Sequence, residues 1–292
     1  MGTKILYYGI LLPLSRLPFG ILYLLSDVMF LALYHIVGYR RKVVYGNIKN
    51  SFPEKTTQEL RDIEKEFYRH LCDLVVESIK TFTISKEEAL ERLTVKNPEV
   101  TNQFHANGQS IVGVGGHNGN WEIYAVVCAM QIRHTPIALY TSLSNKFFDA
   151  KMRESRSRYG LDMVPTSQKD SMMHDHPEPS LYIFGIDQCP KKSQRAYWME
   201  FLNQETGVQF GAEKFARDHG LPVVFGNIRK LKRGYYEVEY QVVCEDPKVL
   251  ETGEIMRRST LMLEKCILEQ PAYWLWSHKR WKHKREEFIK QQ

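Results

Sequence analysis

Residues 110–122 read SIVGVGGHNGNWE, and this stretch decides the fold class. Its first part, Ser110–Val114, is a short apolar run rich in β-branched residues, which is typical of a buried strand. Two glycines then precede His117, and either Asn118 or Asn120 could begin a helix as its N-cap. The stretch therefore predicts a strand that passes through a glycine turn and a histidine into a helix.

The same alternation of strands and helices continues on both sides of this turn. Strands are predicted at Leu93–Val95, Ser110–Val114, Pro136–Tyr140, Asp162–Pro165, Leu181–Ile186, Pro222–Ile228 and Tyr235–Val243. Helices are predicted at Glu59–Ile79, Asn120–Gln131, Lys146–Tyr159, Phe210–Asp218 and Gly253–Glu269. This order favours an α/β fold with a mainly parallel central sheet flanked by helices, and the turn at 232–234 adds one antiparallel hairpin.

The composition is that of a globular protein with an anionic partner. The chain has 292 residues, of which 43% are hydrophobic, so it can bury a large core. Its net charge of +6 favours lipid headgroups, an acidic carrier protein, phosphates or nucleic acid as partners. The five cysteines are widely spaced and include no Cys-x-x-Cys pair, and His174 and His176 lie in a proline-containing loop. We therefore expect no disulfide framework, no metal site and no other cofactor.

The N-terminal region is strongly apolar. Residues 5–37 are rich in Leu, Ile, Tyr and Phe, and only Arg16 and Asp27 interrupt them with charge. No uncharged run reaches the roughly 20 residues of a simple membrane-spanning helix. We expect a helical segment that bends at Pro13 and Pro18 and lies in the membrane interface. A tilted span and a helix buried in the core are the alternatives.

This region sets the expected domain organisation. Residues 1–42 are predicted to form an N-terminal membrane-associated helical segment, and residues 43–292 an α/β domain. The basic cluster Arg40–Lys42 closes the segment. Basic residues flanking a membrane segment favour the cytoplasmic side, so we expect the domain on the cytoplasmic face of the membrane.

His117 and Glu122 are the candidate catalytic pair. Five residues apart on one helix, their side chains would point about 140° away from each other. They can meet only if His117 lies in the turn before the helix and Glu122 in its first turn. A carboxylate at one imidazole nitrogen would fix the tautomer and leave the other nitrogen to accept a proton. No serine or cysteine nucleophile elbow follows, so the activated hydroxyl would belong to the substrate. A histidine satisfied structurally in a turn is the alternative.

Further polar residues are predicted around this pair. Arg153, on a helix that also carries Arg156 and Arg158, is a candidate for stabilising an oxyanion or binding phosphate, with a solvated basic helix as the alternative. Asp187 ends a predicted strand at the same sheet edge, where it could support the site or cap the turn. Asn120 is a third supporting candidate, at the start of the helix.

Two segments are predicted to approach ligands or partners. Residues 186–209 are polar and lack periodicity, so we expect a long structureless loop that crosses the site. The C-terminal block PAYWLWSHKRWKHKREEF (271–288) mixes aromatic and basic residues. Such a mixture suits a membrane interface or an acidic protein, and the predicted contact residues are Trp274, Trp276, Arg280 and Trp281. Nucleic acid is the alternative partner, which the apolar N-terminus disfavours.

At these motifs the chain resembles the late acyltransferases of bacterial lipid A biosynthesis, within the glycerolipid acyltransferase superfamily. The matching stretches are GGHNGNWE (115–122), MRESRSRYG (152–160), FGIDQ (184–188), FGAEKFARDHGLPVV (210–224) and EQPAYWLWSHKRWK (269–282). The resemblance implies a glycerol-3-phosphate acyltransferase-like fold and a catalytic His117–Glu122 dyad supported by Arg153. It also implies an acyl-carrier-protein or coenzyme A thioester as donor and a lipid acceptor at the inner membrane.

The chain departs from the family pattern after Asp187-Gln188. The family usually continues with another acid and a glycine, whereas Cys189, Pro190, Lys191 and Lys192 follow here. The acceptor is therefore left open between a lipid A precursor and a related membrane lipid. We expect a monomeric, membrane-associated acyltransferase without a nucleic-acid partner. A lysophospholipid or other lipid O-acyltransferase, a thioester hydrolase and a non-enzymatic membrane scaffold are the alternatives.

Overall fold

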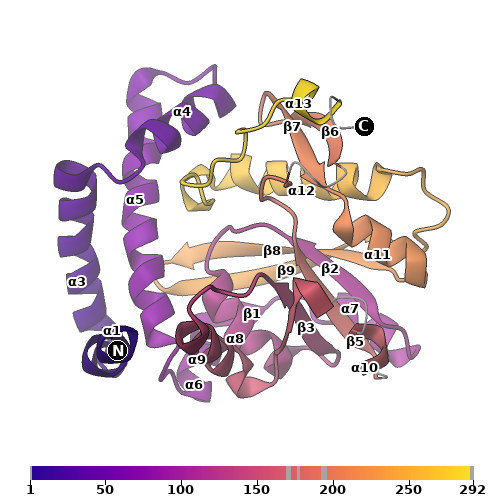
Figure 1. The fold of residues 1–292 in the computed structure, drawn as a ribbon, viewed down its shortest axis with the longest axis horizontal. Helices are drawn as coiled ribbons and strands as arrows, with labels where there is room; N and C mark the ends of the chain where they lie inside the picture. Colours follow the sequence, from indigo (N-terminus) through magenta and orange to yellow (C-terminus); the bar gives the residue numbers. More distant parts are fainter. Residues whose placement is uncertain (1, 169–171, 176–177, 192–195, 290–292) are drawn as a thin grey trace.

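The computed structural model describes residues 2–168, 172–175, 178–191 and 196–289. A seven-stranded sheet forms its centre (Figure 1). In spatial order the strands are β1 (Leu93–Val95), β9 (Tyr235–Cys244), β8 (Val223–Lys232), β2 (Ile111–Gly115), β5 (Ser180–Gly185), β3 (Thr135–Tyr140) and β4 (Asp162–Pro165).

The sheet is mainly parallel, as predicted. The five strands from β8 to β4 pair in parallel, and β1 pairs in parallel with β9. Among the described residues of this sheet, the antiparallel pair is the β8–β9 hairpin, which turns at Arg233–Gly234. Each predicted strand agrees with an observed strand to within a few residues, because each is either a short apolar run or, at 235–243, an alternating apolar–polar run.

Helices cover both faces of the sheet. They are α4 (Arg41–Ser51), α5 (Thr57–Lys80), α6 (Lys86–Arg92), α7 (Glu99–Ala106), α8 (Trp121–Gln131), α9 (Lys146–Arg156), α10 (Met172–Asp175), α11 (Gly211–His219), α12 (Glu254–Glu269) and α13 (Glu286–Ile289). Figure 1 shows α11 and α12 on one side of the sheet and α7 and α8 on the other. The helix α5 begins with a capping box between Thr56 and Glu59, which satisfies the first free amides.

Two apolar cores lie on the two faces, and alternate residues of one strand enter different cores. In β2, Val112 and Val114 pack with α12 and α5, whereas Ile111 packs with α8. In β5, Tyr182 enters the first core and Leu181 the second. This alternation is the period-2 geometry of a strand buried on both faces, and it explains why these strands are continuous apolar runs in the sequence.

The N-terminal region forms two helical arms that meet at a bend. The first arm contains α1 (Gly2–Leu6), a π-helical turn (Tyr7–Leu11) and α2 (Leu12–Ser15). The second contains α3 (Phe19–Leu31) and a π-helical turn (Ala32–Val37). Pro18 lies between them with an extended backbone, and Figure 1 shows α1 end-on beside a lengthwise α3. The predicted bend is therefore present at Pro18, whereas Pro13 lies in the first turn of α2.

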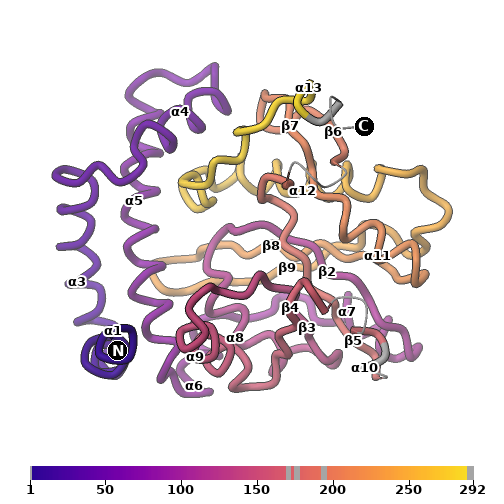
Figure 2. The backbone as a smooth tube through the Cα atoms, viewed as in Figure 1, coloured from indigo at the N-terminus to yellow at the C-terminus, as the bar shows by residue number. Residues whose placement is uncertain are grey.

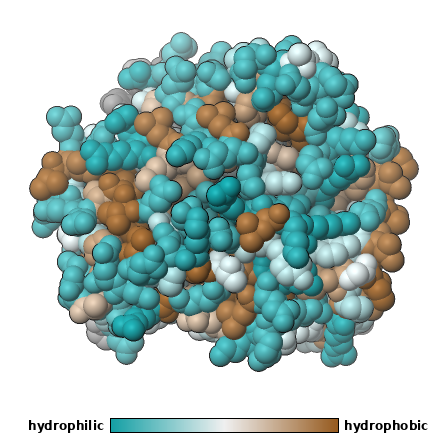
Figure 3. Space-filling view, turned by 180° about the vertical axis from the view of Figure 1, so that it is seen from behind, coloured by the Kyte–Doolittle hydropathy of each residue, from teal (hydrophilic) through white to brown (hydrophobic). Residues whose placement is uncertain are grey.

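The outer surface of α3 is apolar. Leu24 and Val28 are each 65% exposed, and Ile36 is 83% exposed. Seen from behind in Figure 3, hydrophobic side chains form a column along the edge where α3 lies. Among the described residues, the helical segment Phe19–Val37 is long enough and apolar enough to cross a membrane. A helix buried in the core, one of the alternatives, does not fit this exposure.

The segment 186–209 differs from its prediction as a structureless loop. It contains an antiparallel hairpin, β6 (Ala196–Phe201) and β7 (Gln204–Gln209), while residues 192–195 lie outside the described chain. The hairpin turns at Leu202 and Asn203, whose φ angles are +51° and +59°. A two-residue turn with two positive φ angles normally carries Asn-Gly or Asp-Gly. Because Leu202 and Asn203 lack that pattern, the sequence did not predict the hairpin.

The C-terminal segment packs against α4. Asn47 donates hydrogen bonds to the carbonyl oxygens of Trp276 and His278, and Arg40 donates to that of Ser277. The tube in Figure 2 shows this segment, near the yellow end of the chain, passing between α4 and the β6–β7 hairpin. Residues 276–278 are therefore fastened to the beginning of α4.

Candidate active site

The site lies where two neighbouring parallel strands end. Gly115 at the end of β2 pairs with Gly185 at the end of β5. The amide of Ile186 donates to the Gly115 carbonyl at 3.0 Å, which extends the pairing by one residue. His117 and Asp187 each follow their glycine by two positions, so the register of the sheet brings them face to face. Carboxyl ends of parallel strands are the usual location of ligand sites in α/β folds.

His117 and Asp187 make two hydrogen bonds. The imidazole Nδ1 lies 2.7 Å from Asp187 Oδ1, and the backbone amide of His117 donates to Oδ2 at 2.6 Å. The indole Nε1 of Trp274 also donates to Oδ2, at 2.9 Å. A carboxylate surrounded by donors is an acceptor, so the proton of the neutral imidazole resides on Nδ1 and Nε2 presents its lone pair.

The charges around the pair favour a protonatable histidine and an ionised aspartate. Burial acts to lower the pKa of His117. The charge and hydrogen bond of Asp187, together with the charge of Glu122, outweigh burial, so the pKa lies above its ordinary value. Burial acts to raise the pKa of Asp187. The charge of His117 and the hydrogen bonds from His117 and Trp274 outweigh burial, and hold that pKa well below its usual range.

The predicted hydrogen bond between His117 and Glu122 is absent from the hydrogen bonds of the described residues. Glu122 instead accepts a bidentate pair from Arg156, with Nε at 2.9 Å and Nη2 at 2.6 Å, and a third bond from Trp121 Nε1 at 3.1 Å. The Trp121 ring packs edge-on against the imidazole with centroids 4.9 Å apart. Glu122 therefore acts on His117 through charge, and Asp187 is the carboxylate bonded to the ring.

Arg156, rather than Arg153, is bonded to Glu122 of the predicted pair. The two residues are three positions apart on α9, and the Arg153 guanidinium lies over the Tyr140 ring, 6.0 Å from its centroid. Arg158 donates to the carbonyl oxygens of Phe82 and Ile84, which fastens α9 to the chain after α5. The sequence alone does not show which arginine of this helix is bonded to Glu122.

Asn120 supports the site as a helix cap. Its Oδ1 accepts from the amides of Glu122 at 3.0 Å and Ile123 at 2.9 Å, and its Nδ2 donates to Glu77. The side chain is fully buried, so the predicted contact between Asn120 and a substrate or oxyanion is not available. Gly119, just before it, has φ +59° and a backbone carbonyl of Ile228 2.7 Å from where a Cβ would lie, so only glycine fits there.

Three of the four C-terminal residues predicted as membrane or carrier contacts are buried, which corrects that prediction for them. Trp274, Trp276 and Arg280 are 2%, 0% and 1% exposed. Trp274 donates to Asp187, and Arg280 donates to the Gly207 carbonyl in β7 at 2.6 Å. Trp281 is half-buried and stacks near Phe201. An aromatic–basic mixture is typical of an interface, but here it packs the hairpin onto the site.

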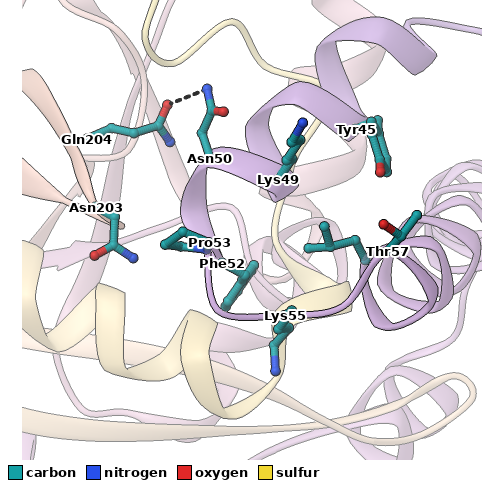
Figure 4. Close-up of a pocket in the computed structure, with 10 residues that line it drawn as sticks. Tyr45, Lys49, Asn50, Phe52, Pro53, Lys55, Thr57, Asn203 and Gln204 are labelled. Atoms are coloured by element: carbon teal, nitrogen blue, oxygen red, sulfur yellow. Dashed lines mark hydrogen bonds between the residues drawn. The ribbon is translucent and has the colours of Figure 1, made fainter.

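A separate pocket of about 530 Å³ lies between the α4–α5 loop and the β6–β7 turn (Figure 4). Its polar lining includes Lys49, Lys55, Asn50, Asn203 and Gln204, and Asn50 donates to Gln204 at 3.3 Å. The residues around His117 do not line it. Within the described ranges, no group of three or more His, Cys, Asp or Glu side chains is arranged to hold a metal ion; His176 lies outside those ranges.

Comparisons with known proteins identify the family of the chain. The model of the bacterial lipid A biosynthesis acyltransferase family matches residues 1–283. The lipid A biosynthesis lauroyltransferase of Escherichia coli (strain K12) is 22% identical over 281 residues, which cover 95% of this chain and 90% of that protein.

The chain belongs to the bacterial lipid A biosynthesis acyltransferase family. The resemblance noted from GGHNGNWE and the later motifs is thereby confirmed, and the chain is an acyltransferase acting on a lipid A-like acceptor. The family match begins at residue 1, so it includes the two apolar N-terminal arms as well as the α/β domain.

We predict that Asp187→Asn moves the acid limb of the pH–kcat/KM profile. Only the unprotonated imidazole of His117 can act as a base. Because the pKa of His117 is raised in the native protein, kcat/KM should rise as the pH passes that raised pKa. Removing the Asp187 charge leaves burial to lower the pKa, and the limb should move to lower pH by about one unit or more. The maximal rate should fall roughly a hundredfold or more, because the ring loses its orienting partner.

Asp62→Asn, on the exposed face of α5, is the control and should leave the profile in place. The measurement is initial rate against pH between 5 and 9, an interval of about four units around the ordinary histidine pKa. An Asp187→Asn profile whose acid limb coincides with that of the native protein would contradict the assignment of Asp187.

Proposed function

We propose that this acyltransferase moves a fatty acyl chain from an acyl-carrier-protein or coenzyme A thioester to a hydroxyl of a lipid A-type acceptor. His117 acts as the general base. The observation that carries the proposal is the bond between Asp187 and Nδ1 of His117, since it leaves Nε2 as the proton acceptor on a side chain that is still 24% exposed.

The reaction we propose is a direct transfer without an acyl-enzyme. As the acceptor oxygen attacks the thioester carbonyl, its proton passes to Nε2 of His117, and Asp187 stabilises the resulting imidazolium. The tetrahedral oxyanion then collapses, the carbon–sulfur bond breaks and the leaving thiolate takes the proton from Nε2. The products are an ester and a free thiol, so the proton and the acyl group are both accounted for.

Arg156 and Glu122 are proposed to support the developing charge. The positive charge of Arg156 is close enough to act on the pKa of His117. Its two hydrogen bonds to Glu122 use Nε and Nη2, and they hold the guanidinium plane in a fixed orientation. A guanidinium fixed in this way can stabilise an oxyanion with little reorganisation. Arg153, predicted for this role, lies one turn earlier on α9, with its guanidinium over the Tyr140 ring.

We further propose that the N-terminal arms hold the enzyme on the cytoplasmic face of the inner membrane. The exposed apolar column of α3 supports contact with acyl chains, and Arg40 and Lys42 lie just beyond its end, where anionic headgroups would be. Such a location would present the insoluble acceptor to the domain at 43–292 while the thioester donor arrives from solution. We propose that a single copy carries the complete site, since His117, Asp187, Glu122 and Arg156 all belong to one chain.

We expect purified enzyme to transfer labelled acyl groups from an acyl-carrier-protein or coenzyme A thioester to a lipid A precursor. His117→Ala should lower kcat by about 10³-fold or more, because the base is lost while the fold is retained. Circular dichroism and thermal melting of the variant serve as the control for folding. Near-native turnover by His117→Ala would refute the role of His117.

The same assay, run without acceptor, separates transfer from hydrolysis. Acceptor-independent loss of thioester at the rate of the complete reaction would identify a hydrolase instead. Replacing the lipid A precursor by a lysophospholipid tests the other acceptor class that the altered residues after Gln188 leave open.

Membrane contact is tested with vesicles. We expect Leu24→Gln with Val28→Gln to weaken binding to vesicles of anionic phospholipid by more than about tenfold, because each exposed side chain would lose roughly 1–2 kcal/mol of transfer free energy. The matched control is Val249→Gln with Leu268→Gln, two apolar side chains that are 75% and 53% exposed elsewhere on the surface. Equal sedimentation of the two double variants with vesicles would rule out α3 as the contact.

A further inference from the structure

A stripe of buried polar residues runs along one face of α5. His70, Asp73 and Glu77 are spaced by three and four positions, so they share a side of the helix, and they are 3%, 3% and 0% exposed. Burying charged groups costs free energy unless they are paired or hydrogen-bonded. These three side chains must therefore be hydrogen-bonded, and some of their partners belong to the loop that carries His117.

Glu77 collects hydrogen bonds from three separate elements. Its Oε2 accepts from Asn120 Nδ2 at 2.5 Å and from the Tyr236 hydroxyl of β9 at 2.8 Å, and its Oε1 accepts from the Tyr23 hydroxyl of α3 at 3.0 Å. Burial raises the pKa of Glu77, and these donors act in the opposite direction by stabilising the carboxylate. The α5 carboxylate thus joins the N-terminal helix, the sheet and the catalytic loop.

The amide of Asn120 has only one orientation that satisfies its neighbours. Its Oδ1 faces the amides of Glu122 and Ile123, so it must be the acceptor that caps α8. Nδ2 then points to the other side and needs an acceptor, which is Glu77. A side chain without an acceptor at position 77 would leave Nδ2 unpaired and loosen the cap.

The cap determines where the first turn of α8 lies relative to His117. That turn carries Trp121, whose ring packs on the imidazole, and Glu122, which binds Arg156. A second bond from the stripe reinforces the loop, because Nε2 of His70 lies 3.0 Å from the Gly119 carbonyl. Burial, followed by the charge of Lys230, lowers the pKa of His70 to about 3, so the ring is neutral and donates from Nε2.

Helix α3 is bound to the same stripe. Ser26 donates to Asp73 Oδ1 at 2.7 Å, and Arg233 in the β8–β9 turn bridges Asp73 and Asp27 with contacts of 2.7 Å each. The loop, α5 and α3 therefore form one hydrogen-bonded unit, in which Glu77 is the member that touches both Tyr23 and Asn120.

We propose that Glu77 is a positioning residue for acyl transfer. It orients Asn120, and through the cap it places Trp121, Glu122 and Arg156 around the imidazole. It touches neither substrate nor the reacting atoms. This inference rests on the proposed function, since the rate it governs is that of the transfer for which His117 is the base.

The test exchanges donor and acceptor between the two positions. Glu77→Leu removes the acceptor for Asn120 Nδ2, and Asn120→Asp places a second carboxylate against Glu77. Each single variant should lower kcat about tenfold or more, with KM for the thioester changed much less, because small misplacements of catalytic groups cost rate rather than binding.

The double variant Glu77→Gln with Asn120→Asp restores a matched pair. The introduced aspartate would still cap α8. The introduced glutamine would donate from its Nε2 to that aspartate, while its Oε1 accepts from Tyr23. We expect kcat to recover to within about threefold of the native value, whereas Asn120→Asp alone stays about tenfold or more below it. Glu77→Gln alone should stay near native, because its amide can turn so that Oε1 accepts from Asn120 and Tyr236.

Glu64→Gln is the matched control. Glu64 is also fully buried on α5, but its partners are Arg41 and Arg61, away from the catalytic loop. It should lower the melting temperature while kcat of the folded protein stays within about twofold of native.

Three outcomes separate the hypotheses. A native enzyme without transfer activity would overturn the proposed function itself. An active native enzyme, with single variants that lose melting temperature but retain kcat, would reduce Glu77 to a structural residue and overturn this inference alone. A double variant that stays as slow as Asn120→Asp alone would overturn it as well.

Discussion

The site depends on the hydrogen bond between Nδ1 of His117 and Oδ1 of Asp187. Its geometry follows from the sheet, because β2 and β5 are parallel neighbours in register at Gly115 and Gly185, and each residue follows its glycine by two positions. The bond keeps Asp187 ionised, raises the pKa of His117 and directs Nε2 outward. The other features of the site, including Trp274 against Asp187 and Trp121 against the ring, hold this pair in place.

Several parts of the molecule could be predicted from local sequence. The strands and the histidine turn follow from apolar runs and glycine placement, and the N-terminal bend follows from Pro18. The carboxylate partner of His117 could not be found in that way, because Glu122 is close in sequence whereas Asp187 is close only through sheet order. The β6–β7 hairpin was missed since Leu202 and Asn203 adopt positive φ without a glycine, and the C-terminal tryptophans were misassigned because composition does not distinguish a buried cluster from an interface.

The N-terminal arms and the α/β domain form a connected structure. One side of α3 is exposed and apolar, while the other side makes hydrogen bonds to a buried polar stripe on α5. An apolar exterior suits contact with lipid, and buried polar bonds give directional attachment that apolar packing alone does not provide. The lipid A acyltransferase family match covers both parts. The sequence did not predict that His70, Asp73 and Glu77 are buried, because the polar residues of an amphipathic helix are expected to face water.

The most direct test of the account is a nitrogen-15 NMR titration of the histidine side chains, with His117 assigned by its loss in a His117→Asn sample. The account predicts a neutral imidazole protonated on Nδ1 and a pKa above the ordinary value of about 6.5. A neutral form protonated on Nε2, or a pKa below that value, would show that Asp187 does not hold the ring and would contradict the central claim.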